Sequence, residues 1–227
     1  MRAEYGRGIS YKKERFEMGK KIRILCYGDS NTFGYIPGRG GRYDRHTRWP
    51  GRLQELLGSG YQVVEEGLCG RTTVYEDASE AGRCGLGQIR DAVEKSRPLD
   101  LLIVMLGSND CKRRFGASAA EITEGLGKTA EAAAGCGERA FAVLLIAPAA
   151  MTERVMHSGF GPEFDRRSIE VSKELAQEYE RLAEKCGYGF LDASKATQVS
   201  EADGLHLDAQ GHRKLAEAVS EWVKRQW

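Results

Sequence analysis

The chain has 227 residues, of which 41% are hydrophobic and 30% charged, and its formal net charge is +1. This length and apolar content suit one α/β domain with a hydrophobic core. The near-neutral charge and the lack of a basic block exclude the electrostatic footprint of a nucleic-acid-binding protein.

Residues 1–20 are polar and rich in charge, and they contain no apolar core of a secretory signal. They predict an N-terminal extension ahead of a single domain over residues 21–227. Apolar stretches such as 141–150 are too short to span a bilayer, so we expect no membrane partner. The six cysteines are scattered without CxxC pairs. They predict free thiols in a cytoplasmic protein, with no metal and no cofactor.

Apolar runs alternate with amphipathic stretches along the rest of the chain. The runs predicted as strands are 21–27, 61–66, 100–106, 141–146 and 189–192. The stretches predicted as helices are 49–57, 88–95, 119–134, 169–186 and 209–226. The third run is almost continuously apolar, as is typical of a strand covered on both faces. The alternation therefore indicates a parallel sheet between two helix layers.

Polar residues and glycines gather where predicted strands end. They are Gly28, Asp29 and Ser30 after the first strand, Gly70 and Arg71 after the second, Asn109 and Asp110 after the third, and Asp203 and His206 before the last helix. Binding groups of an open parallel sheet lie beyond the carboxyl ends of its strands. Each segment alone could be a turn or a helix cap. Together they predict one site.

Three of these side chains suit acyl transfer. A serine hydroxyl such as that of Ser30 is a weak nucleophile and needs a base, which His206 can supply near neutral pH. The imidazole in turn needs a carboxylate to fix its tautomer and stabilise its cation. Asp203, three residues before His206, can reach Nδ1 while Nε2 faces Ser30. Negative charge on the substrate oxygen would meet the amides of Ser30 and Gly70 and the side chain of Asn109.

These segments, in this order, resemble the four sequence blocks of the SGNH (GDSL) hydrolases. The matching positions are Gly28-Asp29-Ser30, Gly70, Gly107-x-Asn109-Asp110 and Asp203-x-x-His206. The resemblance implies a flavodoxin-like three-layer sandwich whose five-stranded parallel sheet has the order 2-1-3-4-5. It also implies Ser30 as nucleophile, His206 as base and Asp203 as its orienting acid, with Ser30, Gly70 and Asn109 as the oxyanion hole. Asn31 stands where the family has leucine, which changes the packing behind Ser30.

A narrower similarity concerns residues 48–53, 63–73, 104–115 and 190–194. They resemble the arylesterase/acyltransferase subgroup, which includes an octamer that acylates alcohols in water. The resemblance implies hydrolysis of short-chain, above all acetyl, esters through an acyl-enzyme, and acyl transfer to alcohols. It also implies a homo-oligomer, up to an octamer, with contacts by the loop at 35–47. The alternative within the class is a carbohydrate acetylesterase acting on small acetylated sugars.

Several positions leave two interpretations open. Substrate-binding candidates are Asp29, Phe33, Trp49 and Arg71. Asp29 also suits a turn or a polar network, Phe33 and Trp49 suit the core, and Arg71 suits packing against Glu65 or Glu66.

Other residues compete for the catalytic roles. Asp192 is a rival orienting acid, and His46 and His157 could shape the pocket entrance. His212 is predicted to be partly exposed. A remote alternative is a non-catalytic flavodoxin-like module that binds a ligand such as FMN.

Overall fold

The computed structural model describes residues 20–136 and 140–227, so the predicted extension at 1–20 lies outside the described residues except for its last position. The strands are β1 (Ile22–Gly28), β2 (Tyr61–Gly67), β3 (Leu101–Met105), β4 (Ala142–Ala147) and β5 (Gly189–Asp192). They form one parallel sheet in the order β2-β1-β3-β4-β5. The predicted fold class and strand order are confirmed.

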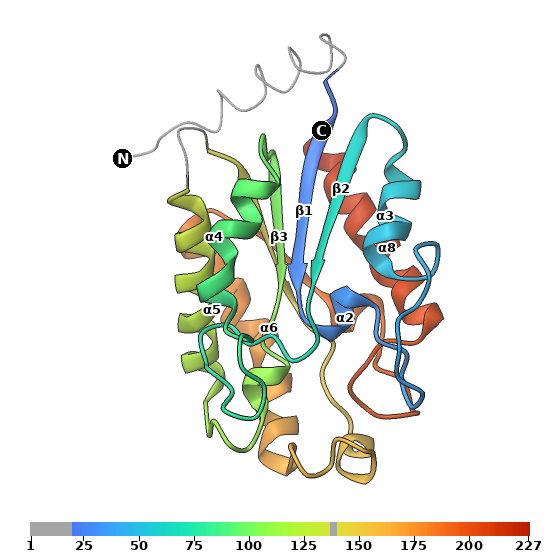
Figure 1. The fold of residues 1–227 in the computed structure, drawn as a ribbon, viewed down its shortest axis with the longest axis vertical. Helices are drawn as coiled ribbons and strands as arrows, with labels where there is room; N and C mark the ends of the chain where they lie inside the picture. The colour runs from blue at the N-terminus through green and yellow to red at the C-terminus, as the bar shows by residue number, and fades with distance from the viewer. Residues whose placement is uncertain (1–19, 137–139) are drawn as a thin grey trace.

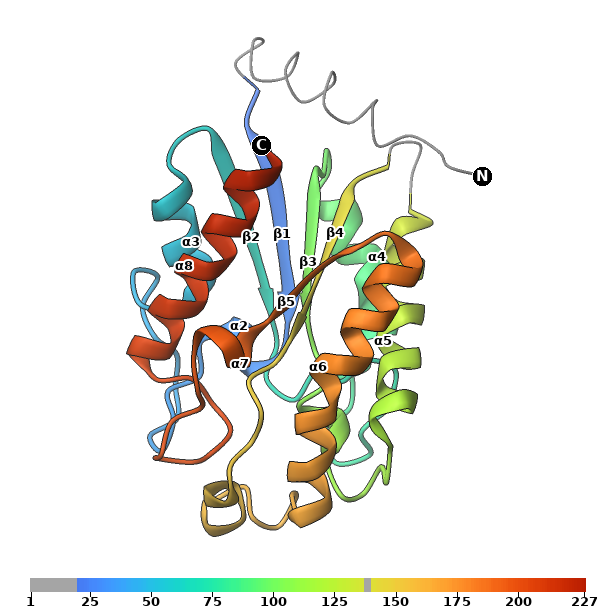
Figure 2. The same cartoon turned by 180° about the vertical axis from the view of Figure 1, so that it is seen from behind.

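Helices cover both faces of this sheet (Figures 1 and 2). The long helices are α3 (Trp49–Leu57), α4 (Gly85–Lys95), α5 (Ala119–Ala134), α6 (Arg166–Cys186) and α8 (Ala209–Gln226). The short ones are α2 (Ser30–Phe33), η1 (Asn109–Cys111), η2 (Glu153–His157) and α7 (Ala193–Ala196). Helices α3 and α8 pack together on one face, and α4, α5 and α6 lie side by side on the other. Among the described residues, no helix has both the length and the apolar character needed to cross a bilayer.

The core has two parts, one on each face of the sheet. Along β1, Ile24 and Cys26 face the layer of α3 and α8, whereas Leu25 and Tyr27 face the layer of α4, α5 and α6. All of β3 is buried, because it lies inside the sheet and is covered on both sides. All six cysteines are unpaired, as predicted, and four of them are buried.

Two helices begin three residues earlier than predicted, α4 at Gly85 and α6 at Arg166. For α6 the reason is a capping box. The Asp165 carboxylate accepts from the Ser168 amide at 2.9 Å, and the Ser168 hydroxyl binds the Asp165 amide at 3.1 Å. The first turn is thus held by polar bonds that the apolar periodicity does not reveal.

The pairing register brings three strand ends to one level. Gly28, the last residue of β1, is aligned with Gly67 of β2 and with Met105 of β3. The segments that follow these strands therefore leave the sheet at the same edge. Helix α2 begins there two residues after β1 ends, so the geometry of this edge decides where the polar side chains meet.

Candidate active site

Ser30 lies at the point where β1 turns directly into α2. A Cβ on Gly28 would lie 2.1 Å from Thr32 Oγ1 and 2.7 Å from the Met105 carbonyl oxygen, so only glycine fits this bend. The Asp29 carboxylate then accepts from the Asn31 amide at 2.9 Å and caps the helix. The strand thereby presents Ser30 in the first turn of a helix, with 7% of its surface exposed.

His206 and Asp203 lie in a tight turn before α8. Asp203 Oδ1 accepts from the amides of Leu205 at 3.0 Å and His206 at 2.9 Å. Gly204, which lies between Asp203 and Leu205, has φ +71°, and a Cβ there would lie 2.5 Å from the Val155 nitrogen. The turn thus needs glycine at that position.

The structure brings the three predicted catalytic side chains into one hydrogen-bonded chain. Asp203 Oδ2 lies 2.8 Å from His206 Nδ1, and His206 Nε2 lies 2.9 Å from Ser30 Oγ. Burial alone would raise the pKa of Asp203, but its bonds to His206 and the backbone amides outweigh this and hold the pKa below its ordinary value. Because a carboxylate only accepts, Nδ1 carries the proton and Nε2 presents its lone pair to the serine hydroxyl.

Two aromatic rings that were not predicted as site residues lie against the imidazole. The ring centroid of Tyr35 is 4.4 Å and that of Phe160 is 5.1 Å from that of His206. The two aromatic centroids are 6.0 Å apart, in an edge-to-face arrangement. Tyr35 follows Ser30 by five residues, which is a weak signal. Phe160 comes from a distant segment with no motif.

The predicted oxyanion donors lie on neighbouring loops. Gly70 has φ +80°, a backbone conformation that favours glycine. Asn109, the first residue of η1, donates from Nδ2 to the Arg71 carbonyl oxygen at 3.1 Å. This bond ties the Asn109 side chain to the residue that follows Gly70. An amide has two N–H groups, and this bond uses one of them. Donation by the second to a substrate oxygen stays a prediction.

We expect Asn109→Ala to lower kcat by about 10²–10³-fold, because one donor to the developing negative charge would be lost. Asn109→Asp would lower it at least as much, since a carboxylate places an acceptor where a donor is needed. Steady-state hydrolysis of 4-nitrophenyl acetate measures both effects. Unchanged kcat in both variants would remove Asn109 from the predicted oxyanion hole.

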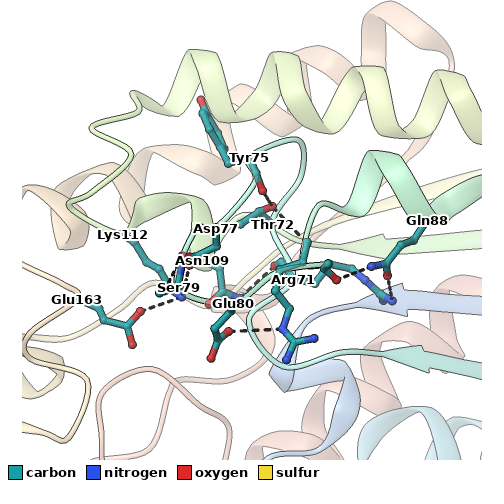
Figure 3. A network of polar contacts seen from close by, with 12 residues as sticks. Arg71, Thr72, Tyr75, Asp77, Ser79, Glu80, Gln88, Asn109, Lys112 and Glu163 are labelled. Atoms are coloured by element: carbon teal, nitrogen blue, oxygen red, sulfur yellow. Dashed lines mark hydrogen bonds and ion pairs between the residues drawn. The ribbon is translucent and has the colours of Figure 1, made fainter.

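Arg71, for which substrate contact and packing against Glu65 or Glu66 were both left open, takes a structural position. Its side chain is buried and donates to the Gly28 carbonyl at 2.9 Å and to the Glu66 carbonyl. It also reaches Gln88 Oε1 at 3.0 Å (Figure 3). The guanidinium also lies 4.0 Å from the centroid of the Tyr27 ring. Arg71 thus holds the ends of β1 and β2 together, and its contact with Glu66 is to the backbone.

Trp49 and Asp29 also belong to the scaffold. Trp49, the first residue of α3, is fully buried in the core. Of the two interpretations left open for it, this position fits core packing. Asp29 is 1% exposed and serves as the helix cap described above. Phe33 is half-buried, with the Arg42 guanidinium 4.6 Å from its ring centroid, and its role toward substrate stays a prediction.

The prediction for His212 was wrong. Its side chain is fully buried, and Nδ1 accepts from the Trp49 amide at 3.3 Å. Burial lowers the pKa of His212 to about 3, so it stays neutral. The sequence placed it near the start of a surface helix, but the face of α8 that carries it is turned toward the core.

The remaining competitors lie outside the hydrogen-bonded chain of Ser30, His206 and Asp203. His46 is exposed and pairs with Glu55, and His157 is exposed in η2. Asp192 caps α7 by accepting from the Ser194 amide at 2.9 Å.

Two buried aspartates near the site make the free energy of unfolding depend on pH. Burial raises the pKa of Asp29 and of Asp110 to about 6, even though Asp110 Oδ1 accepts from the Thr73 amide at 2.9 Å and from its hydroxyl at 2.5 Å. Between about pH 4 and 6 the folded state therefore holds protons that the unfolded chain has released. The free energy of unfolding falls as the pH rises through this window.

We expect Asp110→Asn to reduce this fall by up to roughly 3 kcal/mol, because it removes one of the two titrations while an amide oxygen can still accept from Thr73. His212 acts in the opposite direction within this window, because its pKa of about 3 lies below the ordinary value. Asp77 and Asp203, whose pKa values also lie below the ordinary range, act in the opposite direction below the window. Urea unfolding at pH 4, 5, 6 and 7 measures the slopes. Parallel curves for the variant and the parent would contradict the prediction.

A buried ionic cluster joins the loops around the site (Figure 3). Lys112 Nζ lies 3.2 Å from Asp77 Oδ2 and 2.8 Å from Glu163 Oε2, and Arg114 reaches the same two carboxylates at 2.8 and 2.6 Å. The Asp77 side chain has no exposed surface and that of Lys112 is 5% exposed. The cluster links the loops after β2 and β3 to the segment that carries Phe160.

Lys112→Met is expected to lower the free energy of unfolding by about 2–4 kcal/mol, because the buried Asp77 carboxylate keeps only the half-exposed Arg114 as a charged partner. The matched control is Lys128→Met, which removes a pair with Glu124 whose side chains are 56% and 68% exposed. That pair contributes less than about 1 kcal/mol. Equal losses in the two variants by chemical denaturation would contradict a stabilising cluster.

Known proteins resemble this chain over most of its length. The model of the GDSL-like lipase/acylhydrolase family matches residues 26–214. The solved structure of a carbohydrate acetylesterase from Sinorhizobium meliloti shares 34% identity and a TM-score of 0.84, over 91% of this chain and 100% of that one. The aryl esterase of M. smegmatis shares 30% identity and a TM-score of 0.85, with the same coverage.

A curated acetylxylan esterase from Xylanibacter ruminicola is 24% identical over 227 residues. That match takes in 89% of this chain but 43% of the relative, so the chain spans less than half the length of that protein. The family model covers well over half of the chain. The chain therefore belongs to the GDSL-like lipase/acylhydrolase family.

Proposed function

We propose that this protein hydrolyses short-chain esters, above all acetyl esters, through an acyl-enzyme on Ser30. The observation that carries the proposal is the hydrogen-bonded chain from Asp203 through His206 to Ser30. His206 takes the proton of Ser30 Oγ as the oxygen attacks the ester carbonyl carbon. It then donates that proton to the leaving alcohol, and Asp203 stabilises the imidazolium in between.

The second half of the reaction uses the same groups in reverse. Water gives a proton to His206 as it attacks the acyl carbon, and the imidazolium returns that proton to Ser30 Oγ when the acid leaves. In both halves the carbonyl oxygen becomes negative and is met by the amides of Ser30 and Gly70 and by Asn109. An alcohol in place of water would yield a new ester.

Two observations support a small acyl group and acyl transfer. Ser30 is 7% exposed and His206 only 2%, and the rings of Tyr35 and Phe160 pack against the imidazole. This burial favours a short acyl chain over a long one beside the nucleophile. The same apolar cover limits the water that reaches the acyl-enzyme, which favours a competing alcohol.

Small acetylated sugars are a second substrate class with comparable support. A carbohydrate acetylesterase and an aryl esterase are about equally similar to this chain, at 34% and 30% identity. Both classes present the same acetyl group to Ser30 and differ only in the alcohol that leaves.

The test is a panel of 4-nitrophenyl esters of graded acyl length, run beside acetylated xylose, each with and without a competing alcohol. We expect kcat/KM to be highest for acetate and the added alcohol to give a transfer product. The rates on acetylated xylose and on the aryl acetate decide between the two alcohol classes. A preference for long acyl chains would overturn the proposed acyl specificity.

Assembly and location stay predictions of this proposal. A homo-oligomer with contacts through the loop at 35–47 would place a subunit boundary next to Tyr35, which lies against His206. Sedimentation equilibrium measures the oligomer. A monomer at micromolar concentration would contradict it. The cytoplasmic location, the absence of a cofactor and the absence of a nucleic-acid partner stay predictions from the sequence.

A further inference from the structure

Asn31, the residue after the proposed nucleophile, makes two side-chain bonds to the segment that carries His206. Nδ2 donates to the Leu205 carbonyl oxygen at 3.3 Å, and Oδ1 accepts from the Leu207 amide at 2.9 Å. The side chain is buried, with 5% of the residue exposed. A single amide thus binds the peptide groups on both sides of His206, across 174 and 176 residues of sequence.

Most other backbone bonds of this segment come from nearby in the sequence. The exception is the bond from the Thr152 amide to the Gly204 carbonyl oxygen at 3.1 Å, which ties the turn to the segment before η2 and not to α2. The amides of Leu205 and His206 bind Asp203, and the His206 carbonyl accepts from the Ser200 amide at 2.7 Å. Those bonds fix the shape of the turn. They do not fix where the turn lies relative to α2, whereas the two bonds of Asn31 do.

We propose that Asn31 is a positioning residue that holds the His206 imidazole in register with Ser30 for proton transfer. The inference rests on the proposed function. Ser30 and Asn31 are consecutive in the first turn of α2, so a clamp on Asn31 sets the distance from Ser30 Oγ to Nε2. Proton transfer requires placement to within about 0.5 Å, which a turn outside regular secondary structure reaches only when neighbouring groups restrain it.

The two bonds of the Asn31 side chain distinguish this chain from family members with leucine at this position. Leucine can fill the space behind Ser30, but it neither donates nor accepts, so the Leu205 carbonyl and the Leu207 amide would need other partners. Asn31 satisfies both buried groups at once, and its own backbone amide binds the Asp29 cap. The three residues Asp29, Ser30 and Asn31 therefore link β1 to the base-bearing turn.

The decisive variant is Asn31→Leu, which keeps the branched shape of the side chain and removes both bonds. It is measured with ethyl acetate and 4-nitrophenyl acetate, using kcat/KM because that constant reports acylation. Ethoxide needs a proton from His206 to leave, whereas nitrophenolate leaves without one. We expect kcat/KM to fall about tenfold or more on the aryl ester and by a clearly larger factor on ethyl acetate, since general acid catalysis contributes about 10²–10⁴-fold.

Asn31→Asp is the second variant and covers the case in which Asn31→Leu does not fold. Its carboxylate can accept from the Leu207 amide but repels the Leu205 carbonyl, so we expect a loss in the same direction and with the same dependence on the leaving group. Thr123→Val is the matched control. It removes a buried hydroxyl whose bond, at 2.7 Å, stays within α5, and we expect it to leave both kcat/KM values unchanged.

The outcomes separate the inference from the proposed function. If the parent enzyme cleaves esters but an Asn31 variant keeps kcat/KM on both within about twofold, or loses both by the same factor, Asn31 does not position the base. If the parent shows no ester cleavage that depends on Ser30, the proposed function fails first. Circular dichroism and thermal unfolding establish that each variant compared is folded.

Discussion

Ser30→Ala should lower kcat for 4-nitrophenyl acetate by about 10⁴- to 10⁶-fold, because no acyl-enzyme can form without the hydroxyl. The reason is structural: Ser30 Oγ is the atom that His206 Nε2 faces at 2.9 Å, at the carboxyl edge of the sheet. Alanine keeps the Ser30 backbone amide and the helix cap at Asp29. The loss would therefore be one of chemistry and not of folding.

Ser220→Ala is the matched control for this prediction. Ser220 is a buried serine on α8, 3% exposed, and we expect full activity when its hydroxyl is removed. A fluorophosphonate probe should label the parent and the control but not Ser30→Ala. Full hydrolysis by Ser30→Ala would mean that another residue attacks the ester, and the proposed mechanism would fall.

Asp203→Asn should lower kcat by about 10⁴-fold while leaving the fold intact. Asp203 accepts three bonds in the turn, two from backbone amides and one from His206 Nδ1. An asparagine oxygen can still accept from the amides. Its NH₂ group, however, would donate to the imidazole and favour the tautomer with the proton on Nε2, which cannot accept from Ser30. The charge that stabilises the imidazolium would also be lost.

The lowered pKa of Asp203 sets the direction in which activity depends on pH. The pKa of Asp203 lies below its ordinary value, so the ionised form that orients His206 persists until the pH falls through that lowered value. The matched control is Asp192→Asn at the rival acid, which caps α7 and should retain activity. Loss of activity in Asp192→Asn but not in Asp203→Asn would exchange the two roles.

Much of the site could be predicted because its residues are tied to local features. Ser30 follows a buried strand through a bend that only glycine fits, and Asp203 and His206 share a single turn. These are short-range relations that spacing preserves. The edge at which they meet follows from the parallel sheet, because all carboxyl ends point the same way.

The wrong prediction for His212 and the open interpretations of Trp49 and Arg71 arose because each side chain could face either of two directions. His212 and Trp49 lie on α8 and α3, which pack against one another over the sheet, and their amide-to-imidazole bond forms only there. For Arg71, the sequence left open substrate contact or packing against Glu65 or Glu66. Arg71 turns inward because the carbonyl oxygens at the ends of β1 and β2 converge on its guanidinium.

By itself, the sequence determined the fold class, the strand order through its family resemblance, and the set of residues that form the Ser30–His206–Asp203 chain. The tertiary structure alone decided which groups surround that chain: Tyr35 and Phe160 against the imidazole, the ionic cluster at Lys112, and the two bonds of Asn31. The physical reason is the distance along the sequence over which each kind of interaction acts. Periodicity and turn chemistry act over a few residues, whereas these contacts join segments far apart in sequence, and their partners become known only once the sheet sets the distance between its loops.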